Sequence, residues 1–387
     1  MTITETDKKY IAHTYNRFPV ELVSGRGSRF TDTAGKEYID LGSGIGVTAF
    51  GTGDEEWKRA VTEQLDKLQH TSNLYYTEPC ARLAELICTR TGMSRVFFSN
   101  SGAEANECAI KAARKYAAEH KGPDYYTIVT LKNSFHGRTL TTLAATGQDG
   151  FHKLFAPLTP GFAYADANDL EGTVALARGV KAAGIMIECV QGEGGVLPLS
   201  ADYVKGLYDF CQAEDIILMA DEVQTGNGRT GRLYAYENFG IKPDLFSTAK
   251  GLGGGLPIGA TVLGEKLADI FSFGDQGSTF GGNPVASAGA YSILSRIDEA
   301  LLASVREKSA YIFGELTGAP GVKSVSGLGL MIGILPEKPA RQVVTECLEG
   351  GVLCLTAKEK VRLLPALNIP FDDLKTAVAV LKSALAD

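Results

Sequence analysis

The chain has 387 residues, which exceeds the size of one ordinary hydrophobic core and predicts about two domains. Its composition, 44% hydrophobic and 21% charged, is typical of a water-soluble globular protein, and its net charge of −7 disfavours nucleic acid as a partner because no basic surface is available to neutralise phosphates. No apolar run reaches the ~18 residues of a membrane helix, and the first residues do not have the pattern of a secretory signal, so we expect a cytoplasmic protein without a membrane partner.

The cysteines and histidines favour the same compartment. The seven cysteines are odd in number and lie scattered through apolar segments, which predicts buried thiols in a reducing environment. None of them forms a Cys-x-x-Cys pair, and the five histidines have no metal-ligand spacing. We therefore expect no metal site.

The predicted elements divide the chain into three stretches. The N-terminal part has short strands such as residues 38–40, and between about residues 93 and 263 short apolar runs alternate with helical patterns. The apolar runs predict strands at residues 95–99, 127–131, 185–189, 216–220, 245–248 and 260–263. This alternation predicts an α/β fold, in which helices cover both faces of a mostly parallel sheet. After a helical stretch near residues 285–299, the pattern becomes α+β, as in a small second domain.

The expected boundaries follow from these patterns. Residues 1–45 and 286–387 are expected to form the small α+β domain together, and residues 46–285 the large domain.

The first segment with a chemical signature follows the strand at residues 95–99. Ser101, Gly102 and Ala103 open a helical pattern that runs to about His120, and a helix N-terminus offers free backbone N–H groups to a phosphate. Ser101 and Glu104 also match a capping box, and a plain helix cap is the alternative interpretation.

The next two strands are followed by further candidates. Phe135, after the strand at 127–131, could stack on a flat ring, although simple core packing is equally open, and Arg138 could form two hydrogen bonds with a carboxylate. Glu193 follows the strand at 185–189 and lies between glycines, which would allow its backbone to adjust.

Asp221 and Lys250 are the most informative pair. Asp221 follows an apolar run and should lie at the carboxyl end of a buried strand, where open α/β sheets bind ligands. Val223 is two residues on and can project the same way. Lys250 precedes the run Gly251-Leu252-Gly253-Gly254-Gly255, so a bulky group can approach it closely, as a lysine that condenses with a carbonyl requires. Singly, such an Asp is often a turn residue and such a Lys a surface residue.

Near the C-terminus, Arg362 lies in an apolar run and should have an acidic partner. Glu193 is the candidate, because a pair that can open would let Arg362 bind a substrate carboxylate. The glycine clusters match neither the dinucleotide fingerprint nor the P-loop, which disfavours a nicotinamide dehydrogenase.

These motifs together resemble the class III (subgroup II) aminotransferases, which depend on pyridoxal phosphate and have fold type I. The resemblance covers nearly the whole chain, and it is carried by residues 15–20, 100–107, 135–139, 220–226, 277–284, 355–357 and 362–365. One departure is Gly51-Thr52-Gly53-Asp54-Glu55, where many relatives have Gly-His-x-His-Pro.

The resemblance implies roles for individual residues. Lys250 would form the Schiff base with the cofactor and carry the proton, Asp221 would pair with the pyridine nitrogen, and Gln224 would lie near the phenolic oxygen. Val223 and Phe135 would hold the ring between them. Ser101, Gly102 and Ala103 would bind the phosphate, and Thr279 would reach the phosphate in the other subunit, which implies a homodimer with shared active sites. The implied substrate-binding residues are Tyr15 and Arg138 for the donor's α-carboxylate, Arg362 for 2-oxoglutarate, Glu193 as its gate, and Ser278.

The resemblance also implies a reaction, the transfer of the δ-amino group between N2-acetylornithine and 2-oxoglutarate in arginine biosynthesis. The alternatives are class III transaminases that act on ornithine, succinyldiaminopimelate or 4-aminobutyrate, and a non-catalytic pyridoxal-phosphate-binding protein of the same fold. A glutamate semialdehyde mutase is disfavoured, because it has no second dicarboxylate for Arg362 to bind.

Overall fold

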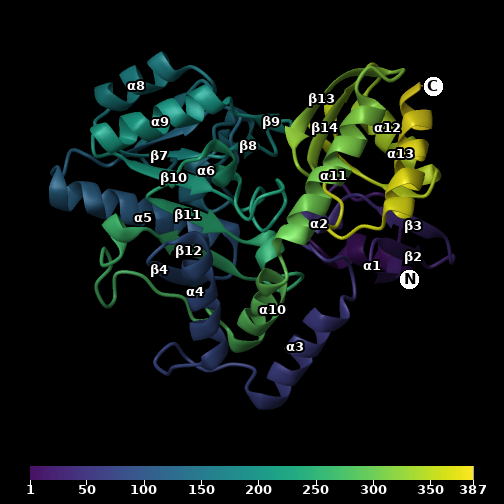
Figure 1. Cartoon of the computed structure of the whole chain (residues 1–387), viewed down its shortest axis with the longest axis horizontal. Coiled ribbons are helices and arrows are strands. Elements are labelled where there is room, and N and C mark those ends of the chain that lie inside the picture. Colours follow the sequence, from purple (N-terminus) through teal and green to yellow (C-terminus); the bar gives the residue numbers. More distant parts are fainter. Residues whose placement is uncertain (387) are drawn as a thin grey trace.

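The computed structural model describes residues 1–386, and Figure 1 shows their elements in two groups. The larger group contains most of the first three quarters of the chain. The smaller group brings the N-terminal strands beside the C-terminal helices and strands. The predicted boundaries at residues 45/46 and 285/286 remain predictions.

A seven-stranded sheet forms the centre of the larger group. Its strands, in spatial order, are β4 (Arg95–Ser99), β12 (Gly259–Leu263), β11 (Leu245–Thr248), β10 (Ile217–Asp221), β7 (Ala182–Ile187), β5 (Thr127–Leu131) and β6 (Phe162–Ala165). β12 is antiparallel to both of its neighbours, and the other pairings are parallel. The mostly parallel sheet of the predicted α/β fold is therefore confirmed.

Strand β10 is buried on both faces, and its side chains alternate between two apolar clusters. Ile217 and Met219 pack in the cluster that contains helix α5 (Gly102–His120). Leu218 and Ala220 pack in the cluster that contains helix α9 (Ala201–Ala213). Because the side-chain period of a strand is two residues, Asp221, which ends β10, belongs to the same face as Met219 and points toward α5.

The remaining elements of the larger group cover and connect these strands (Figure 1). They are α3 (Glu55–Lys67), α4 (Glu78–Thr91), α6 (Leu140–Ala145), α7 (Asp149–His152), β8 (Val190–Gln191), β9 (Leu197–Pro198), α8 (Leu170–Gly179), α10 (Pro284–Ser295) and the short 3₁₀ helices Ala235–Phe239, Lys250–Leu252 and Glu265–Leu267.

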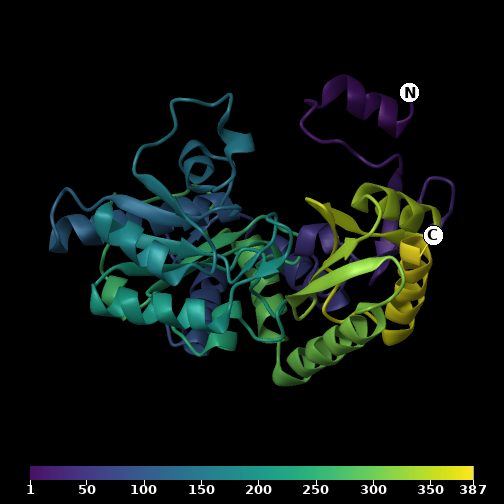
Figure 2. The same cartoon turned by 90° about the horizontal axis from the view of Figure 1, so that it is seen from above.

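The smaller group contains two four-stranded sheets. One has the order β1 (Leu22–Arg26), β2 (Arg29–Asp32), β3 (Glu37–Asp40) and β15 (Val352–Leu353), and the other has the order β13 (Val322–Leu328), β14 (Met331–Pro336), β17 (Lys360–Leu363) and β16 (Leu355–Ala357). The pairing of β15 with β3 joins the two ends of the chain. The helices of this group are α1 (Ile3–Tyr10), α2 (Ser43–Gly46), α11 (Glu299–Leu316), α12 (Ala340–Glu349) and α13 (Phe371–Ala386), and Figure 2 shows α1 standing away from the sheets.

The strands predicted at residues 95–99, 127–131 and 245–248 have the observed bounds. The strand predicted at 185–189 begins and ends earlier, because the run from Ala182 is already buried and Glu188 turns away to accept backbone hydrogen bonds. The prediction missed β6, a short edge strand. Within residues 1–386, no helix combines the length and apolar character needed to cross a membrane.

Candidate active site

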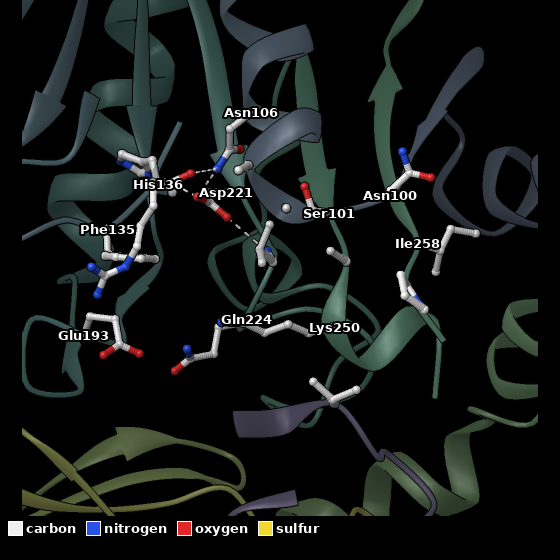
Figure 3. Close-up of a pocket in the computed structure, with 18 of the residues that line it drawn as sticks. Asn100, Ser101, Asn106, Phe135, His136, Glu193, Asp221, Gln224, Lys250 and Ile258 are labelled. Carbon is white, nitrogen blue, oxygen red and sulfur yellow. Dashed lines mark hydrogen bonds and ion pairs between the residues drawn. The ribbon is translucent and has the colours of Figure 1, made fainter. Parts of the chain in front are cut away.

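A cavity of about 440 Å³ opens at the carboxyl ends of the parallel strands. Its walls come from the N-terminus of α5 and from the segments that follow β5, β7, β10 and β11. Figure 3 shows side chains from these separate segments turned toward one space. Open α/β sheets bind ligands at this edge, because several strands end there together.

One end of the cavity is the N-terminus of α5. Ser101 caps the helix, and its Oγ accepts a hydrogen bond from the N–H of Glu104 at 3.2 Å and donates to the Glu104 carboxylate at 2.9 Å. The helix cap that we considered as the alternative interpretation is therefore present. The first N–H groups of the helix still have no intrahelical partner and carry its positive partial charge. A side chain at Gly102 would overlap Val223, since a Cβ would lie 2.6 Å from the valine Cγ1.

Asp221, at the end of β10, also lines the cavity, where it is 4% exposed. Its Oδ2 accepts hydrogen bonds from His136 Nδ1 at 2.7 Å and from Asn106 Nδ2 at 2.8 Å. Its Oδ1 accepts one from the N–H of Val223 at 3.0 Å. Burial alone would lower the pKa of His136, but the hydrogen bond and the charge of Asp221 outweigh it and the net shift is upward.

Lys250 follows β11, which is parallel to β10, and its side chain lines the cavity. Its backbone has φ +44°, a left-handed conformation that costs a non-glycine residue free energy and that clusters at functional sites. Burial lowers the pKa of Lys250, and Arg362 acts in the same direction, whereas Glu193 opposes them. A lowered pKa makes the neutral amine, the nucleophilic form, more accessible.

Phe135 and Val223 also line the cavity. The ring of Phe135 contacts that of Phe151 edge-on at 6.0 Å between centroids, and the guanidinium of Arg138 lies over both rings. Arg138 is exposed at the rim and takes part in none of the ion pairs among residues 1–386. It is therefore available to a ligand carboxylate.

Glu193 lines the cavity and forms an ion pair with Arg362, which is buried and does not itself line the cavity. The Arg362 Nη1 donates to Glu193 Oε1 at 2.5 Å and to Gln224 Oε1 at 3.2 Å. Burial alone would raise the pKa of Glu193, but the charge of Arg362 outweighs it and the net shift is downward. The Nε of Arg362 is buried and has no partner among the described residues, so the guanidinium keeps a donor for another acceptor.

The glycines around Glu193 allow neighbouring segments to approach the backbone closely. A Cβ at Gly192 would lie 2.4 Å from Gln224 Oε1, and a Cβ at Gly194 would lie 2.6 Å from the carbonyl oxygen of Asn133. These positions are tightly packed, so a side chain would not fit at either of them. That the glycines let the backbone of Glu193 adjust stays a prediction.

Glu188 is a buried carboxylate that also faces the cavity. It accepts hydrogen bonds from the N–H of Phe135 at 2.9 Å and of Gly192 at 3.3 Å, and thereby joins the segments that carry Phe135 and Glu193. Burial raises the pKa of Glu188 to about 7, with His136 acting against this shift and Asp221 in the same direction.

Four of the predicted residues do not line this cavity, namely Arg362, which is buried against Glu193 and Gln224, and Tyr15, Ser278 and Thr279. Tyr15 is 73% exposed in the N-terminal segment. Thr279 is exposed, and Ser278 accepts a hydrogen bond from Asn100 Nδ2 at 3.2 Å through its Oγ. A subunit on its own therefore does not bring Tyr15 or Thr279 to Lys250, and their roles remain predictions.

The sequence analysis also missed polar residues of the site, namely Asn106, His136 and Glu188. Asn106 and His136 lie in residues 100–107 and 135–139, which carry the family resemblance, but no role was predicted for either residue. A buried polar residue in an otherwise apolar helix face was the available signal for Asn106.

The chain is similar to known proteins in family, in sequence and in structure. The model of the family Aminotransferase class-III matches residues 10–385. The acetylornithine aminotransferase of Haemophilus ducreyi is 49% identical to this chain over 100% of the chain and 98% of the relative. The acetylornithine aminotransferase of Methanocaldococcus jannaschii is 43% identical over 99% of the chain and 98% of the relative.

Two solved structures illustrate the likeness in fold. The N-acetylornithine aminotransferase from Stenotrophomonas maltophilia K279a has a TM-score of 0.84 and 34% identity, and the match covers 99% of this chain and 98% of that one. The ornithine aminotransferase from Toxoplasma gondii ME49 has a TM-score of 0.95 and 30% identity, over 99% and 94% of the two chains. Because the fold is shared by proteins named for different donors, the fold alone does not select the donor.

Proposed function

The chain belongs to the class III aminotransferases, and from this premise we propose that it is a pyridoxal-phosphate-dependent enzyme that moves the δ-amino group between N2-acetylornithine and 2-oxoglutarate. The names of the relatives at 43% and 49% identity support this donor. The observation that carries the acceptor is the Glu193–Arg362 pair, whose acid lines the cavity. Such a reaction belongs to arginine biosynthesis, and the seven cysteines, all free, support a reducing compartment such as the cytoplasm.

The residues of the cavity fit this cofactor. A phosphate suits the free N–H groups of Ser101, Gly102 and Ala103, where the missing side chain of Gly102 leaves the helix end open. A protonated pyridine nitrogen suits Asp221 Oδ1, which has only one donor within the described residues. Phe135 and Val223 supply apolar surfaces for a flat ring, and Gln224 supplies an amide for its phenolic oxygen.

Bound pyridoxal phosphate supplies an aldehyde that accepts the amino group and a ring that withdraws electrons from the reacting carbon. The neutral amine of Lys250 is the nucleophile that would hold the cofactor between turnovers. With substrate bound, the amine of Lys250 would be the group placed to take a proton from the reacting carbon and to hand it back. Asp221 favours the protonated pyridine, and its buried position strengthens that interaction.

The two substrates make opposite demands on Arg362. 2-Oxoglutarate brings a second carboxylate, which can accept hydrogen bonds from the guanidinium and its unpaired Nε. The reacting end of acetylornithine brings no such group, and leaving a buried arginine unpaired costs roughly 3–5 kcal/mol. Glu193 covers the arginine in that half-reaction and rotates away in the other. Arg138, at the rim, is the candidate partner for the α-carboxylate of acetylornithine.

Removal of the Glu193 carboxylate should therefore affect the two half-reactions unequally. In Glu193→Ala, amino transfer from acetylornithine should slow about tenfold or more, because Arg362 loses its partner, whereas transfer from glutamate should be as fast or faster. Single-turnover absorbance measurements with each donor test this, and the wild-type protein in the same experiment tests the proposed reaction. Glu193→Gln keeps the shape without the charge and should give the same imbalance. Equal losses in both half-reactions would show that Glu193 is not a gate.

We also propose a homodimer in which Thr279 reaches the partner's phosphate site. Asn73 Nδ2 donates to the carbonyl oxygens of Ser278 and Gly281, both at 2.9 Å, so the segment of Thr279 is fixed beside residues 74–76. The large apolar side chains that these two segments expose are Leu74, Tyr75, Tyr76 and Phe280. An exposed cluster of this kind favours a protein interface.

A charge placed in this cluster should separate the subunits. Tyr76→Glu should sediment as a monomer and lose most turnover, because each site would lack the partner's Thr279. Sedimentation velocity of the wild type and the variant at equal concentration is the measurement. A wild-type protein that is monomeric and fully active would contradict the proposal.

A further inference from the structure

Asn106 is a polar residue of the cavity wall whose place in the site needs an explanation. It lies on α5 one helical turn after Gly102, at the phosphate end of the site, and is 1% exposed. Around it, α5 buries mainly alanine, cysteine and isoleucine on the sheet. An apolar side chain would suit this packing, so the presence of an amide requires a separate reason.

The reason lies in the two hydrogens of its amide. Asn106 Nδ2 donates to Asp221 Oδ2 at 2.8 Å and to the carbonyl oxygen of His136 at 2.8 Å (Figure 3). Its own Oδ1 is buried and has no partner within residues 1–386. An unpaired buried carbonyl oxygen destabilises the fold. The two hydrogen bonds that Nδ2 donates are therefore the reason for an amide at this position.

The two oxygens of Asp221 consequently differ. Oδ2 receives two donors, from Asn106 and His136, and both are buried. Oδ1 receives only the N–H of Val223. With Oδ2 held from two directions, the carboxylate cannot rotate without breaking both hydrogen bonds, so Oδ1 stays available to a group in the cavity.

We propose that Asn106 is a positioning residue that ties the phosphate-binding end of α5 to Asp221 and fixes Oδ1 toward the ring nitrogen of the cofactor. Helix α5 then sets the distance between the two ends of the site, because residues 101–103 and Asn106 belong to one rigid helix. Asn106 acts through Asp221 and not on the reacting atoms. The proposal rests on the proposed function in one respect, the pairing of Asp221 with a ring nitrogen.

Cofactor affinity separates this role from a general loss of structure. The full-length protein, freed of cofactor, would be titrated with pyridoxal phosphate and with its 1-deaza analogue, which lacks the ring nitrogen. The wild type should prefer pyridoxal phosphate, and in Asn106→Ala that preference should fall about 10- to 100-fold, the usual range for a hydrogen bond to a charged group. Thr261→Val is the matched control, because the buried Thr261 Oγ1 donates to the carbonyl oxygen of Ala105 on the same helix without contacting Asp221. It should keep the preference.

The variant Asn106→Asp supplies a second readout. It places a carboxyl group beside Asp221 Oδ2, and two carboxyl groups that share a site retain one proton to an unusually high pH. While the introduced carboxyl holds that proton, it can donate to Asp221 as the amide does. The preference for pyridoxal phosphate should therefore be present at low pH and should vanish as pH rises. Other titratable groups also interact with Asp221, namely His136, Glu188, Glu222 and Lys250. The pH dependence of the preference in the wild type is the reference that accounts for them.

The outcomes are distinguishable. If Asn106→Ala keeps the wild-type preference, or if Asn106→Asp follows the wild-type pH profile, Asn106 does not position Asp221 and the inference is wrong. If the wild type itself binds the two cofactors equally well, the proposed pairing of Asp221 with the ring nitrogen is wrong.

Discussion

Lys250→Ala should bind pyridoxal phosphate without a covalent bond and should lose turnover by several orders of magnitude. The loss is large because one side chain serves both as the nucleophile and as the proton carrier, and general acid–base catalysis alone contributes about 10²- to 10⁴-fold. The cavity should still hold the cofactor, since the N-terminus of α5 and Asp221 are unchanged. Borohydride reduction followed by peptide mapping should find the cofactor on Lys250 in the wild type and on no lysine in the variant.

Lys308 offers a matched control for this experiment. It is also a buried lysine whose pKa is lowered by burial, but its Nζ donates to the carbonyl oxygen of Leu367, away from the cavity. Lys308→Met should keep the covalent cofactor and the chemistry, even where it lowers stability. A reduced adduct on a lysine other than Lys250 in the wild type would refute the assignment.

Asp221→Asn should keep the cofactor and lose about 100-fold or more in turnover. The surrounding hydrogen bonds determine the orientation of the new amide. His136 and Asn106 both donate to the Oδ2 position, so the amide oxygen must occupy it, and the NH₂ group must take the place of Oδ1. There it faces the N–H of Val223 and presents a donor to the ring nitrogen, which favours the unprotonated pyridine.

Two measurements on the Asp221→Asn protein separate this explanation from loss of the fold. The absorbance of the bound cofactor should change. The free energy of unfolding should fall too little to explain the loss in turnover by loss of folded protein. Near-normal turnover in this variant would mean that the ring nitrogen is held in another way.

The central sheet was predictable because its strands are buried on both faces. β10 is an apolar run from Ile217 to Ala220 between polar turns, and a buried strand fits so short a run. β6 was missed because it is a short edge strand that is only partly buried.

The candidate site was predictable where a motif follows directly from a strand or opens a helix. Ser101, Asp221 and Lys250 were found in this way. Asn106 and His136 were not, because their roles depend on how far α5 and the segment after β5 lie from Asp221, and spacing along the chain does not give that distance. The particular neighbours of the glycines beside Glu193 were not predictable for the same reason, since Gln224 and Asn133 are remote in sequence.

The most direct test of the proposed function follows one amino group through the wild-type protein. The purified protein with bound pyridoxal phosphate would be mixed with N2-acetylornithine labelled with ¹⁵N at the δ position, and 2-oxoglutarate would be added afterwards. The absorbance of the cofactor should change on the first addition and recover on the second, and the label should appear in glutamate. Ornithine, succinyldiaminopimelate and 4-aminobutyrate should transfer more slowly under the same conditions. An absorbance that does not respond to acetylornithine, or a faster transfer from one of these other donors, would contradict the proposal.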